Sequence, residues 1–449
     1  MHIAIIGNGI SGITAARFLR KLSDHKITVI SAESDYFFSR TALMYIYMGH
    51  MRLQDTQPYE DWFWEKNRID LKRGYVETVD PQNKTLSFKD GEQLSYDKLI
   101  IASGSESNKF GWPGQDLDGV HGMYTLQDLE AMERHSTGLK RAVIVGGGLI
   151  GIEMAEMFHS RHIPVTFLVR ENAYWNMVLP KEESAMIGRH ILENGIELKF
   201  ETELKEIVDD GNGKACAIIT NKGERIECGF VGLTAGVHPN TSFLKDSVIE
   251  MQRGILVNEM LETNNPDIYA IGDCAQLREP REGRRNIEAI WYTGKMMGET
   301  VAYNICDQPI AYNPGIWFNS AKFFEIEYQI YGTVLARAPE SHKSLYWEHS
   351  EGRKAIRIVY DSDNNDTILG FHLMGIRYRH EVCEKWIHEK ASVTTVLENL
   401  QLANFDPEFY KTYEADLIKK YNKTSGKQLT LKKKSGLDNV FRFLSKLKA

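Results

Sequence analysis

Short continuous apolar runs, separated by amphipathic segments, dominate the hydrophobic pattern of this chain. The runs over residues 2–6, 26–31 and 164–169 have the length and β-branched content of fully buried strands. Residues 13–21, between the first two runs, have the composition of a helix, so the local order is strand, helix, strand. Buried strands that alternate with helices form parallel sheets. The pattern therefore predicts an α/β fold.

Between the second and the third of these apolar runs the hydrophobic periodicity changes. Residues 58–66 carry four aromatic side chains and predict an amphipathic helix. Alternating apolar and polar residues over 71–79 and 84–88 predict two strands joined by a turn.

A glycine-rich turn follows the first apolar run. Gly7, Gly9 and Gly12 have the spacing Gly-x-Gly-x-x-Gly, directly between the expected strand and the expected helix. Glycines at these positions let the backbone approach a pyrophosphate, which binds the N–H groups of the helix N-terminus at Ile10, Ser11 and Gly12. The turn predicts a dinucleotide site, and a glycine-rich turn without a ligand is the alternative.

The same arrangement occurs a second time. A strand-like segment over residues 140–145, apolar from Ala142 onward, leads into Gly146, Gly148 and Gly151, and a helical segment follows. Leu149 and Ile150 would supply the first N–H groups of that helix. Two strand–glycine turn–helix units in one chain predict two separate dinucleotide sites.

Three charged residues near strand ends are candidates for ligand contacts. Glu33 follows the second strand, where a carboxylate can accept hydrogen bonds from ribose hydroxyls; a solvated surface glutamate is the alternative. Arg40 could bind a phosphate through its planar fork, or be an ordinary surface arginine. In the second unit the strand is followed by Arg170 and then Glu171. An arginine there can receive a 2′-phosphate, which favours NADPH, but Glu171 leaves NADH open.

Two further strand ends carry small or polar residues. The apolar run before Gly104 ends in Ala102 and Ser103, which let a ligand lie against the backbone. Later in the chain Gly272 allows close approach, and Asp273 can accept a hydrogen bond from a polyol hydroxyl.

Composition narrows the class of protein. The 449 residues are 42% hydrophobic and 26% charged, as in an ordinary globular protein of two or three domains. The formal net charge of −7 gives no reason to expect nucleic acid as a partner. Five scattered cysteines without a CxxC pair, no secretion signal and no apolar run of membrane-spanning length lead us to expect a cytoplasmic location.

These motifs, in this order, resemble the pyridine nucleotide–disulfide oxidoreductase superfamily of two-dinucleotide flavoproteins. The resemblance implies two Rossmann-like domains, as in glutathione reductase, and a small α+β domain. It places FAD in a split domain of residues 1–112 and 246–318, and NAD(P) in residues 113–245. Residues 319–415 would form an interface domain, with a homodimer as a candidate assembly, and residues 416–449 a basic tail. The matching segments are residues 7–12, 96–104, 146–153, 235–240 and 271–273.

The resemblance also implies roles for single residues. Gly272 and Asp273 would contact the ribityl–phosphate part of FAD, and Arg40 its pyrophosphate. Glu153 is similar to the family's carboxylate near the nicotinamide amide. Trp291 stands where an aromatic ring often lies against the flavin, with core packing as the alternative. Gly236 belongs to a matching segment that closes the second unit.

One departure from the family's pattern, in its cysteines, indicates which branch of the family the chain resembles. Neither cysteine motif of the disulfide reductases is present, and the reactive cysteine of the single-cysteine branch aligns with Thr41. The chain therefore resembles more closely the ferredoxin and rubredoxin reductases and the flavin portion of nitrite reductase. We expect an FAD-dependent NAD(P)H oxidoreductase that passes electrons to an iron–sulfur or rubredoxin-type protein. Tyr45 departs from this branch, in which several members have a lysine near the flavin.

Two alternatives remain. The enzyme could deliver electrons to oxygen, as an NAD(P)H oxidase, or to a quinone or another small molecule. It could also be a redox-sensing flavin-binding protein that acts through its basic tail. Residues 419–449 carry ten lysines and arginines against one acid, and residues 437–447 have apolar residues at helical spacing. Such a segment can attract an acidic redox partner or an anionic membrane, or pack on its own protein.

Overall fold

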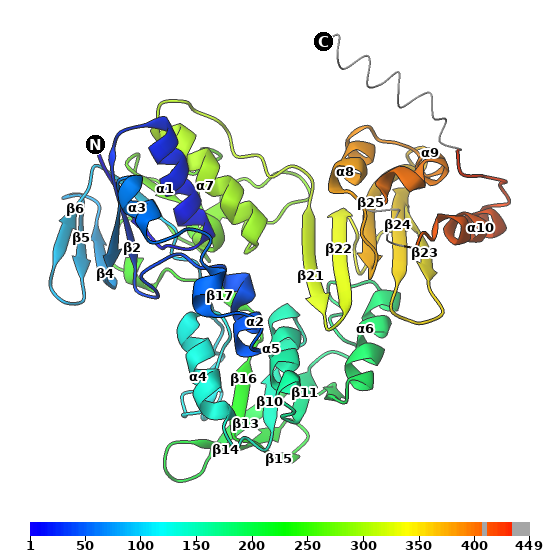
Figure 1. Cartoon of the computed structure of the whole chain (residues 1–449), viewed down its shortest axis with the longest axis horizontal. Coiled ribbons are helices and arrows are strands. Elements are labelled where there is room, and N and C mark those ends of the chain that lie inside the picture. The colour runs from blue at the N-terminus through cyan, green and yellow to red at the C-terminus, as the bar shows by residue number, and fades with distance from the viewer. Residues whose placement is uncertain (406–410, 433–449) are drawn as a thin grey trace. The chain divides into compact units, whose positions relative to one another are not determined.

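The computed structural model describes residues 1–405 and 411–432 (Figure 1). The chain forms two compact units. Unit 1 contains Met1–Trp175 and Gly188–Gly315, and unit 2 contains Asn176–Ile187 and the described residues from Ile316 onward. Among the described residues, no helix is both long enough and apolar enough to cross a membrane.

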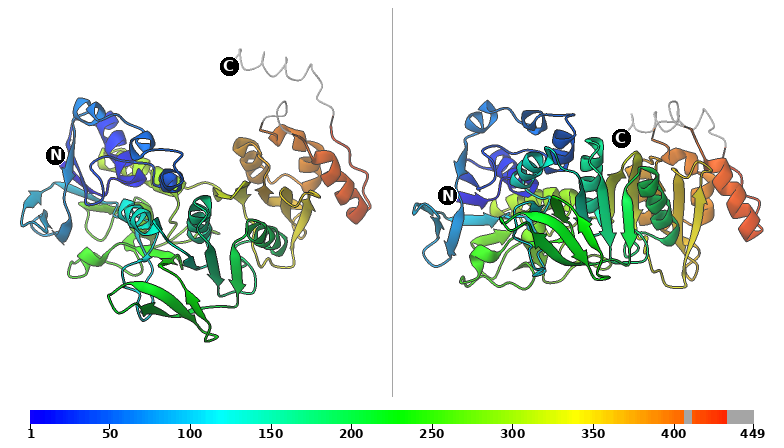
Figure 2. Two further views of the ribbon diagram at one scale, coloured as in Figure 1. Left: turned by 60° about the horizontal axis from the view of Figure 1, so that its bottom comes forward. Right: turned by 90° about the horizontal axis from the view of Figure 1, so that it is seen from below.

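The first sheet of unit 1 has five parallel strands in the order β19-β7-β1-β2-β3. Its central strand is fully buried at Ile3, Ala4 and Ile5, which explains the continuous apolar run in the sequence. Helices α1 and α7 lie side by side (Figures 1 and 2). The bounds are β1 His2–Ile6, α1 Ile10–Leu22, β2 Lys26–Ser31, β3 Ile69–Arg73, β7 Lys98–Ile101, β19 Ile268–Ala270 and α7 Trp291–Ile305.

Two local predictions for this region need correction. The helix expected over residues 58–66 is the single short helix α3, Trp62–Lys66. The strand expected over 71–79 is two strands, β3 and β4 (Val76–Asp80), in two different sheets. The chain changes sheets at Gly74, where a Cβ atom would stand 2.8 Å from the Phe88 ring. A small antiparallel sheet then forms from β4, β5 (Thr85–Phe88) and β6 (Gln93–Ser95).

The second sheet of unit 1 is also parallel, with the order β12-β11-β10-β16-β9. A separate antiparallel sheet, β13-β14-β15, follows it in the chain. The bounds are β9 Val120–His121, α4 Leu126–Ser136, β10 Ala142–Val145, α5 Leu149–Ser160, β11 Val165–Val169, β12 Glu197–Phe200, β13 Leu204–Asp209, β14 Ala215–Thr220, β15 Arg225–Glu227 and β16 Phe230–Leu233.

The chain passes between the two parallel sheets twice, and the two crossings pair with each other. Strand β8 (Ser105–Ser107) leaves the first sheet, β17 (Val237–Pro239) returns from the second, and the two form an antiparallel ladder. Near this ladder the Ser103 hydroxyl donates to the Asn240 carbonyl at 2.6 Å. The remaining elements of unit 1 are α2 Leu43–Tyr47 and the parallel pair β18 Ile255–Val257 with β20 Ala275–Leu277.

Unit 2 is built on an antiparallel sheet with the order β21-β22-β25-β24-β23. Helix α6 begins in the segment 176–187, where Glu183 is fully buried and accepts from Arg357 Nε at 2.7 Å and Nη2 at 2.8 Å. The bounds are α6 Lys181–Glu193, β21 Phe318–Phe323, β22 Ile326–Gly332, β23 His342–Glu348, β24 Ala355–Asp361, β25 Thr367–Met374, α8 His380–His388, α9 Val393–Glu398 and α10 Glu414–Ser425.

The start of the basic C-terminal segment is part of this unit. Helix α10 buries Leu417, Ile418 and Tyr421 in the apolar core of unit 2, while its lysines face outward. The amphipathic stretch expected over 437–447 lies outside the described residues.

Candidate cofactor-binding site

Two glycines of the first turn have no room for a side chain, whereas the third has room for one. A Cβ atom on Gly7 would lie 2.1 Å from the Ala102 carbonyl oxygen, and Gly7 has a φ of +109°. A Cβ atom on Gly12 would lie 2.0 Å from the Gly7 carbonyl oxygen. A Cβ atom on Gly9 would meet nothing within 4 Å. Gly7 and Gly12 are therefore required by packing, whereas Gly9 faces open space.

Helix α1 begins at this open position. Gly9 is its N-cap, no side chain caps it, and the first turn contains no acidic residue. The first helical bond joins the Ile13 N–H to the Gly9 carbonyl at 3.0 Å. The N–H groups of Ile10, Ser11 and Gly12 precede that bond and have no partner within the helix. An uncapped helix N-terminus behind an open glycine fits a pyrophosphate.

Three strand ends meet beside this turn because β1, β7 and β19 are parallel neighbours. Ala102 follows β7, with Ser103 and Gly104 next, and Gly272 follows β19. A Cβ atom on Gly272 would lie 2.4 Å from Ser11 Oγ, so β19 ends against the first turn of α1. The tertiary structure thus brings together the four segments that the sequence singled out separately: the glycine turn, 102–104, 272–273 and Arg40.

Asp273 is a half-buried acceptor within this group. Its Oδ2 accepts hydrogen bonds from Tyr124 Oη at 3.0 Å and from Ser105 Oγ at 3.1 Å. Burial raises the pKa of the Asp273 carboxyl, and hydrogen bonds from Tyr124 and Ser105, together with the charge of Arg40, oppose that rise. Sequence reasoning missed Tyr124 and Ser105, because neither belongs to a motif and only the fold carries them to Asp273.

Glu33 and Arg40 bind each other in the structure. Arg40 donates Nη1 to Glu33 Oε1 at 2.8 Å and Nη2 to Oε2 at 2.5 Å. Arg40 also donates to the Tyr124 carbonyl, and the Leu126 N–H donates to Glu33 Oε1 at 2.8 Å. The pair therefore ties the loop after β2 to the start of α4. Contacts of Glu33 with ribose and of Arg40 with pyrophosphate stay predictions.

Trp291 is the first residue of α7 and is half-buried. The ammonium of Lys295 lies 5.5 Å from the centroid of one Trp291 ring. One turn later, a Cβ atom on Gly294 would stand 2.5 Å from Ser11 Oγ, so this end of α7 lies at the first glycine turn. The position agrees with a ring near a bound flavin, which stays a prediction.

The second glycine turn repeats the geometry of the first. Gly146 has a φ of +116°, and its Cβ would lie 2.7 Å from the Thr234 backbone, at the end of the neighbouring strand β16. A Cβ on Gly151 would lie 2.4 Å from the Gly146 carbonyl, whereas one on Gly148 would meet nothing within 4 Å. Gly148 is the N-cap of α5, with no side-chain cap and no acid in the first turn, which begins at Leu149 and Ile150. This helix end also fits a pyrophosphate.

Glu153 lies in the second turn of α5, close to the N-terminus of that helix. Burial raises the pKa of the Glu153 carboxyl to about 7, and the charge of Glu156 contributes. Tyr174, fully buried, interacts electrostatically with Glu153 and donates its hydroxyl to the Gly148 carbonyl at 3.2 Å. Tyr174 was not foreseen, because an isolated aromatic residue after a strand carries no sequence signal of this contact.

Arg170 and Glu171 lie beyond the end of β11. Arg170 is exposed, and its Nη2 donates to Glu171 Oε1 at 2.9 Å. The sequence predicts that Arg170 favours NADPH and that Glu171 allows NADH, and in the structure these two side chains are paired with each other. Gly236, with a φ of +89°, accepts the Asn108 N–H at 3.0 Å at the ladder between the two sheets.

This site has no reactive cysteine. Thr41 is exposed in the single turn Arg40–Ala42, and its hydroxyl lies 3.2 Å from Ser39 Oγ. All five cysteines lie in the described residues and all are free. Cys274 is fully buried, donates to the carbonyls of Ile101 and Ile271, and has its pKa raised by burial. A buried thiol with a raised pKa is a poor nucleophile.

Known proteins share this organisation. The chain is 28% identical over 279 residues to the assimilatory nitrate reductase electron transfer subunit of Bacillus subtilis, covering 61% of this chain and 36% of that protein. It thus spans about a third of the length of that relative. It is 29% identical over 313 residues to the NADH-rubredoxin oxidoreductase of Clostridium acetobutylicum, covering 69% of this chain and 76% of the relative.

A solved structure agrees with the fold. The crystal structure of NADH:rubredoxin oxidoreductase from Clostridium acetobutylicum superposes with a TM-score of 0.69 and 25% identity, over 88% of this chain and 98% of the other. The likeness confirms the predicted α/β fold class with two Rossmann-type domains.

Residues 1–298 match the family model described as pyridine nucleotide-disulphide oxidoreductase, which is about two thirds of the chain. The match contains both glycine turns and the 271–273 segment, which are the features that predicted the family. It also confirms the predicted cofactor pair, FAD and NAD(P)H. The chain therefore belongs to the pyridine nucleotide-disulphide oxidoreductase family.

Proposed function

We propose that this protein takes a hydride from NAD(P)H onto FAD and passes the electrons to a small iron–sulfur or rubredoxin-type protein. The observation that carries the proposal is Thr41, a non-redox side chain at the position of the family's reactive cysteine. A flavin accepts two electrons and can release them singly, which suits one-electron acceptors and needs no thiol. A relative named for rubredoxin reduction supports the same choice.

The chain's own residues supply binding and orientation. The N-terminus of α1 would bind the FAD pyrophosphate, with Arg40 adding a charge-assisted contact and Asp273 accepting from a ribityl hydroxyl. The N-terminus of α5 would bind the NAD(P)H pyrophosphate in the same way. Glu153, with its raised pKa, would hold a proton for the nicotinamide carboxamide near neutral pH.

The location and assembly are further parts of this proposal. Five unpaired cysteines, one of them fully buried in the apolar core around the first sheet of unit 1, support a reducing, cytoplasmic environment. A homodimer stays a prediction. A membrane contact through the basic tail also stays a prediction, and residues 433–449 of that tail lie outside the described residues.

The decisive experiment is anaerobic stopped-flow spectroscopy of the FAD-loaded protein. Flavin bleaching with NADH and with NADPH is recorded first, and the reduced protein is then mixed with rubredoxin, a [2Fe–2S] ferredoxin, a quinone or oxygen. We expect at least one protein acceptor to reoxidise the flavin about a hundredfold faster than oxygen or quinone, a difference of about 2.7 kcal/mol in barrier.

Equal rates with oxygen and with every protein acceptor would overturn the proposal in favour of an oxidase. A matched variant, Thr41→Ser, keeps the hydroxyl and should leave the rates unchanged. Slow flavin reduction by both nucleotides, with intact flavin binding, would instead favour the redox-sensing alternative.

A further inference from the structure

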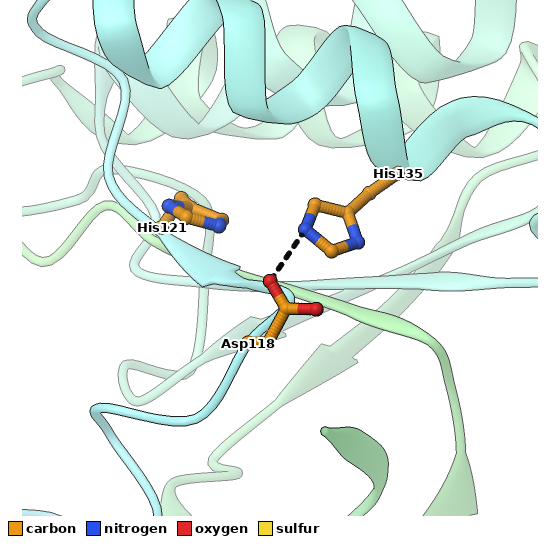
Figure 3. A group of neighbouring side chains, drawn as sticks. All are labelled: Asp118, His121 and His135. Carbon is orange, nitrogen blue, oxygen red and sulfur yellow. Dashed lines mark ion pairs between the residues drawn. The ribbon is translucent and has the colours of Figure 1, made fainter. Parts of the chain in front are cut away.

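A cluster of metal-ligating side chains lies in unit 1 beside β9, the edge strand of the second parallel sheet. It consists of Asp118, His121 and His135, whose ligand atoms all lie within 4.8 Å of one another (Figure 3). His135 Nε2 is 3.0 Å from Asp118 Oδ1. The rings of His121 and His135 are 5.5 Å apart between centroids. None of these residues belongs to the cofactor site described above.

His121 carries the observation that points to a ligand. Its Nε2 is buried and has no hydrogen-bond partner. A buried polar atom without a partner costs free energy, so such atoms in native proteins call for an explanation. A metal ion bound to this nitrogen, together with His135 and Asp118, would provide one.

The backbone holds two of the three ligands in fixed positions. Asp118 donates its N–H to the Gly213 carbonyl and accepts the Ala215 N–H, both at 2.9 Å. His121 ends β9, which pairs with β16. His135 comes from the last turn of α4, so its side chain reaches the cluster from a different element (Figure 3). Ligands on a sheet edge and a helix end make a preorganised site.

We propose that Asp118, His121 and His135 bind a divalent transition metal, with Zn²⁺ as the favoured ion. Two imidazoles and one carboxylate are a donor set that zinc takes, with water in the fourth position. Ligand atoms around tetrahedral zinc stand about 3.3 Å apart. The His135–Asp118 distance of 3.0 Å is close to that spacing, and every pair of ligand atoms in the cluster lies within 4.8 Å. The second Asp118 oxygen, Oδ2, is 3.8 Å from the Lys214 ammonium.

The site would act on the cofactor region through α4. The N-terminal residue of this helix, Leu126, donates its N–H to Glu33, whereas His135 lies at the opposite end. Metal bound at His135 fixes the helix to the sheet edge without touching the cofactor residues. Its role is therefore structural.

The test uses the FAD-loaded full chain after dialysis against a chelator. Titration with Co²⁺ should give intense visible d–d bands at one equivalent per chain, and Zn²⁺ should abolish them. His135→Gln and His121→Gln should each weaken zinc binding by about tenfold or more, measured by competition with a chromophoric chelator. If a histidine variant fails to fold, Asp118→Asn tests the same site with a smaller change.

Two control variants distinguish this site from surface binding. His162→Asn removes an exposed imidazole elsewhere in unit 1 and should leave zinc affinity unchanged. His388→Ala removes the exposed imidazole from a second group, His380, Glu384 and His388 on α8. Loss of binding in His388→Ala but not in His135→Gln would overturn the proposal, as would an absence of cobalt bands in the parent protein.

Discussion

The guanidinium of Arg40 and the carboxylate of Glu33 form a two-point ion pair, with Nη1–Oε1 at 2.8 Å and Nη2–Oε2 at 2.5 Å. The charge of Glu33 raises the pKa of Arg40, which burial alone would lower. The sequence assigned these residues to different parts of one ligand, the ribose and the pyrophosphate. Their pairing indicates that Glu33 fixes the position of the Arg40 side chain.

Replacing Arg40 should therefore weaken FAD binding. In Arg40→Lys a single ammonium replaces the planar fork, so the dissociation constant for FAD should rise about tenfold, or 1.4 kcal/mol. The measurement is quenching of flavin fluorescence during reconstitution of the apoprotein. The matched control is Arg52→Lys, which breaks an exposed two-point pair with Asp55 and should change little. Equal effects of both substitutions would contradict the role of Arg40.

Glycine substitutions should separate folding from ligand binding. Gly12→Ala places a Cβ 2.0 Å from a carbonyl oxygen and should lower the melting temperature by several degrees or prevent folding. Gly9→Ala meets nothing within 4 Å, so the protein should fold but bind FAD about tenfold or more weakly.

Gly148→Ala is the corresponding change in the second turn. It should leave folding and flavin content intact and raise the dissociation constant for NAD(P)H, because its Cβ would also point into open space. Calorimetric titration with nucleotide measures the effect. Loss of flavin in this variant, or full retention of nucleotide affinity, would contradict the assignment of the two turns.

The choice between NADPH and NADH should depend on the Arg170–Glu171 pair. Arg170→Ala should reduce kcat/KM with NADPH by about tenfold and leave NADH nearly unchanged, because only NADPH has a 2′-phosphate. Glu171→Ala releases Arg170 from its partner and should shift the preference toward NADPH. Steady-state kinetics with both nucleotides on the two variants test this. A parallel loss with both nucleotides would show that Arg170 does not distinguish them.

The raised pKa of Glu153 should make folding stability depend on pH. Between the ordinary value of 4.5 and about 7, the folded protein keeps a proton that the unfolded chain releases. The free energy of unfolding contributed by this group therefore falls as pH rises through that window. Glu153→Gln cannot titrate, so it should gain stability relative to the parent as pH rises from about 5 to about 8. Urea unfolding across this range measures it, with the exposed Glu130→Gln as control; parallel curves for the parent and Glu153→Gln would contradict it.

The contact between α1 and α7 should be sensitive to one added methyl group. A Cβ on Gly298 would lie 2.4 Å from the Ser11 carbonyl oxygen, so Gly298→Ala should destabilise the protein by about 1–3 kcal/mol. Gly188→Ala is the control, because its Cβ has only one neighbour, at 3.9 Å, in helix α6. That control should be neutral or stabilising by about 1 kcal/mol. Thermal unfolding distinguishes the two, and equal shifts would contradict the packing argument.

Much of the fold was predictable because its signals are local. The apolar run 2–6 and the glycines at 7, 9 and 12 predict a strand, a turn and a helix within one short stretch of chain. The wrong predictions also have a local cause. The alternation of apolar and polar residues over 71–79 does not show that the chain passes from one sheet to another at Gly74. The helix over 58–66 was overestimated because aromatic residues favour burial as much as helix formation.

The sequence by itself determined the two glycine turns, the family and the absence of a cysteine at Thr41, since each depends on residue identity and short spacing. Tertiary structure alone decided that Tyr124 and Ser105 donate to Asp273, that Arg40 pairs with Glu33, and that His121 meets His135. These contacts join residues up to about 170 positions apart. Parallel strands collect distant chain segments at one sheet edge, and no local pattern records which side chains meet there.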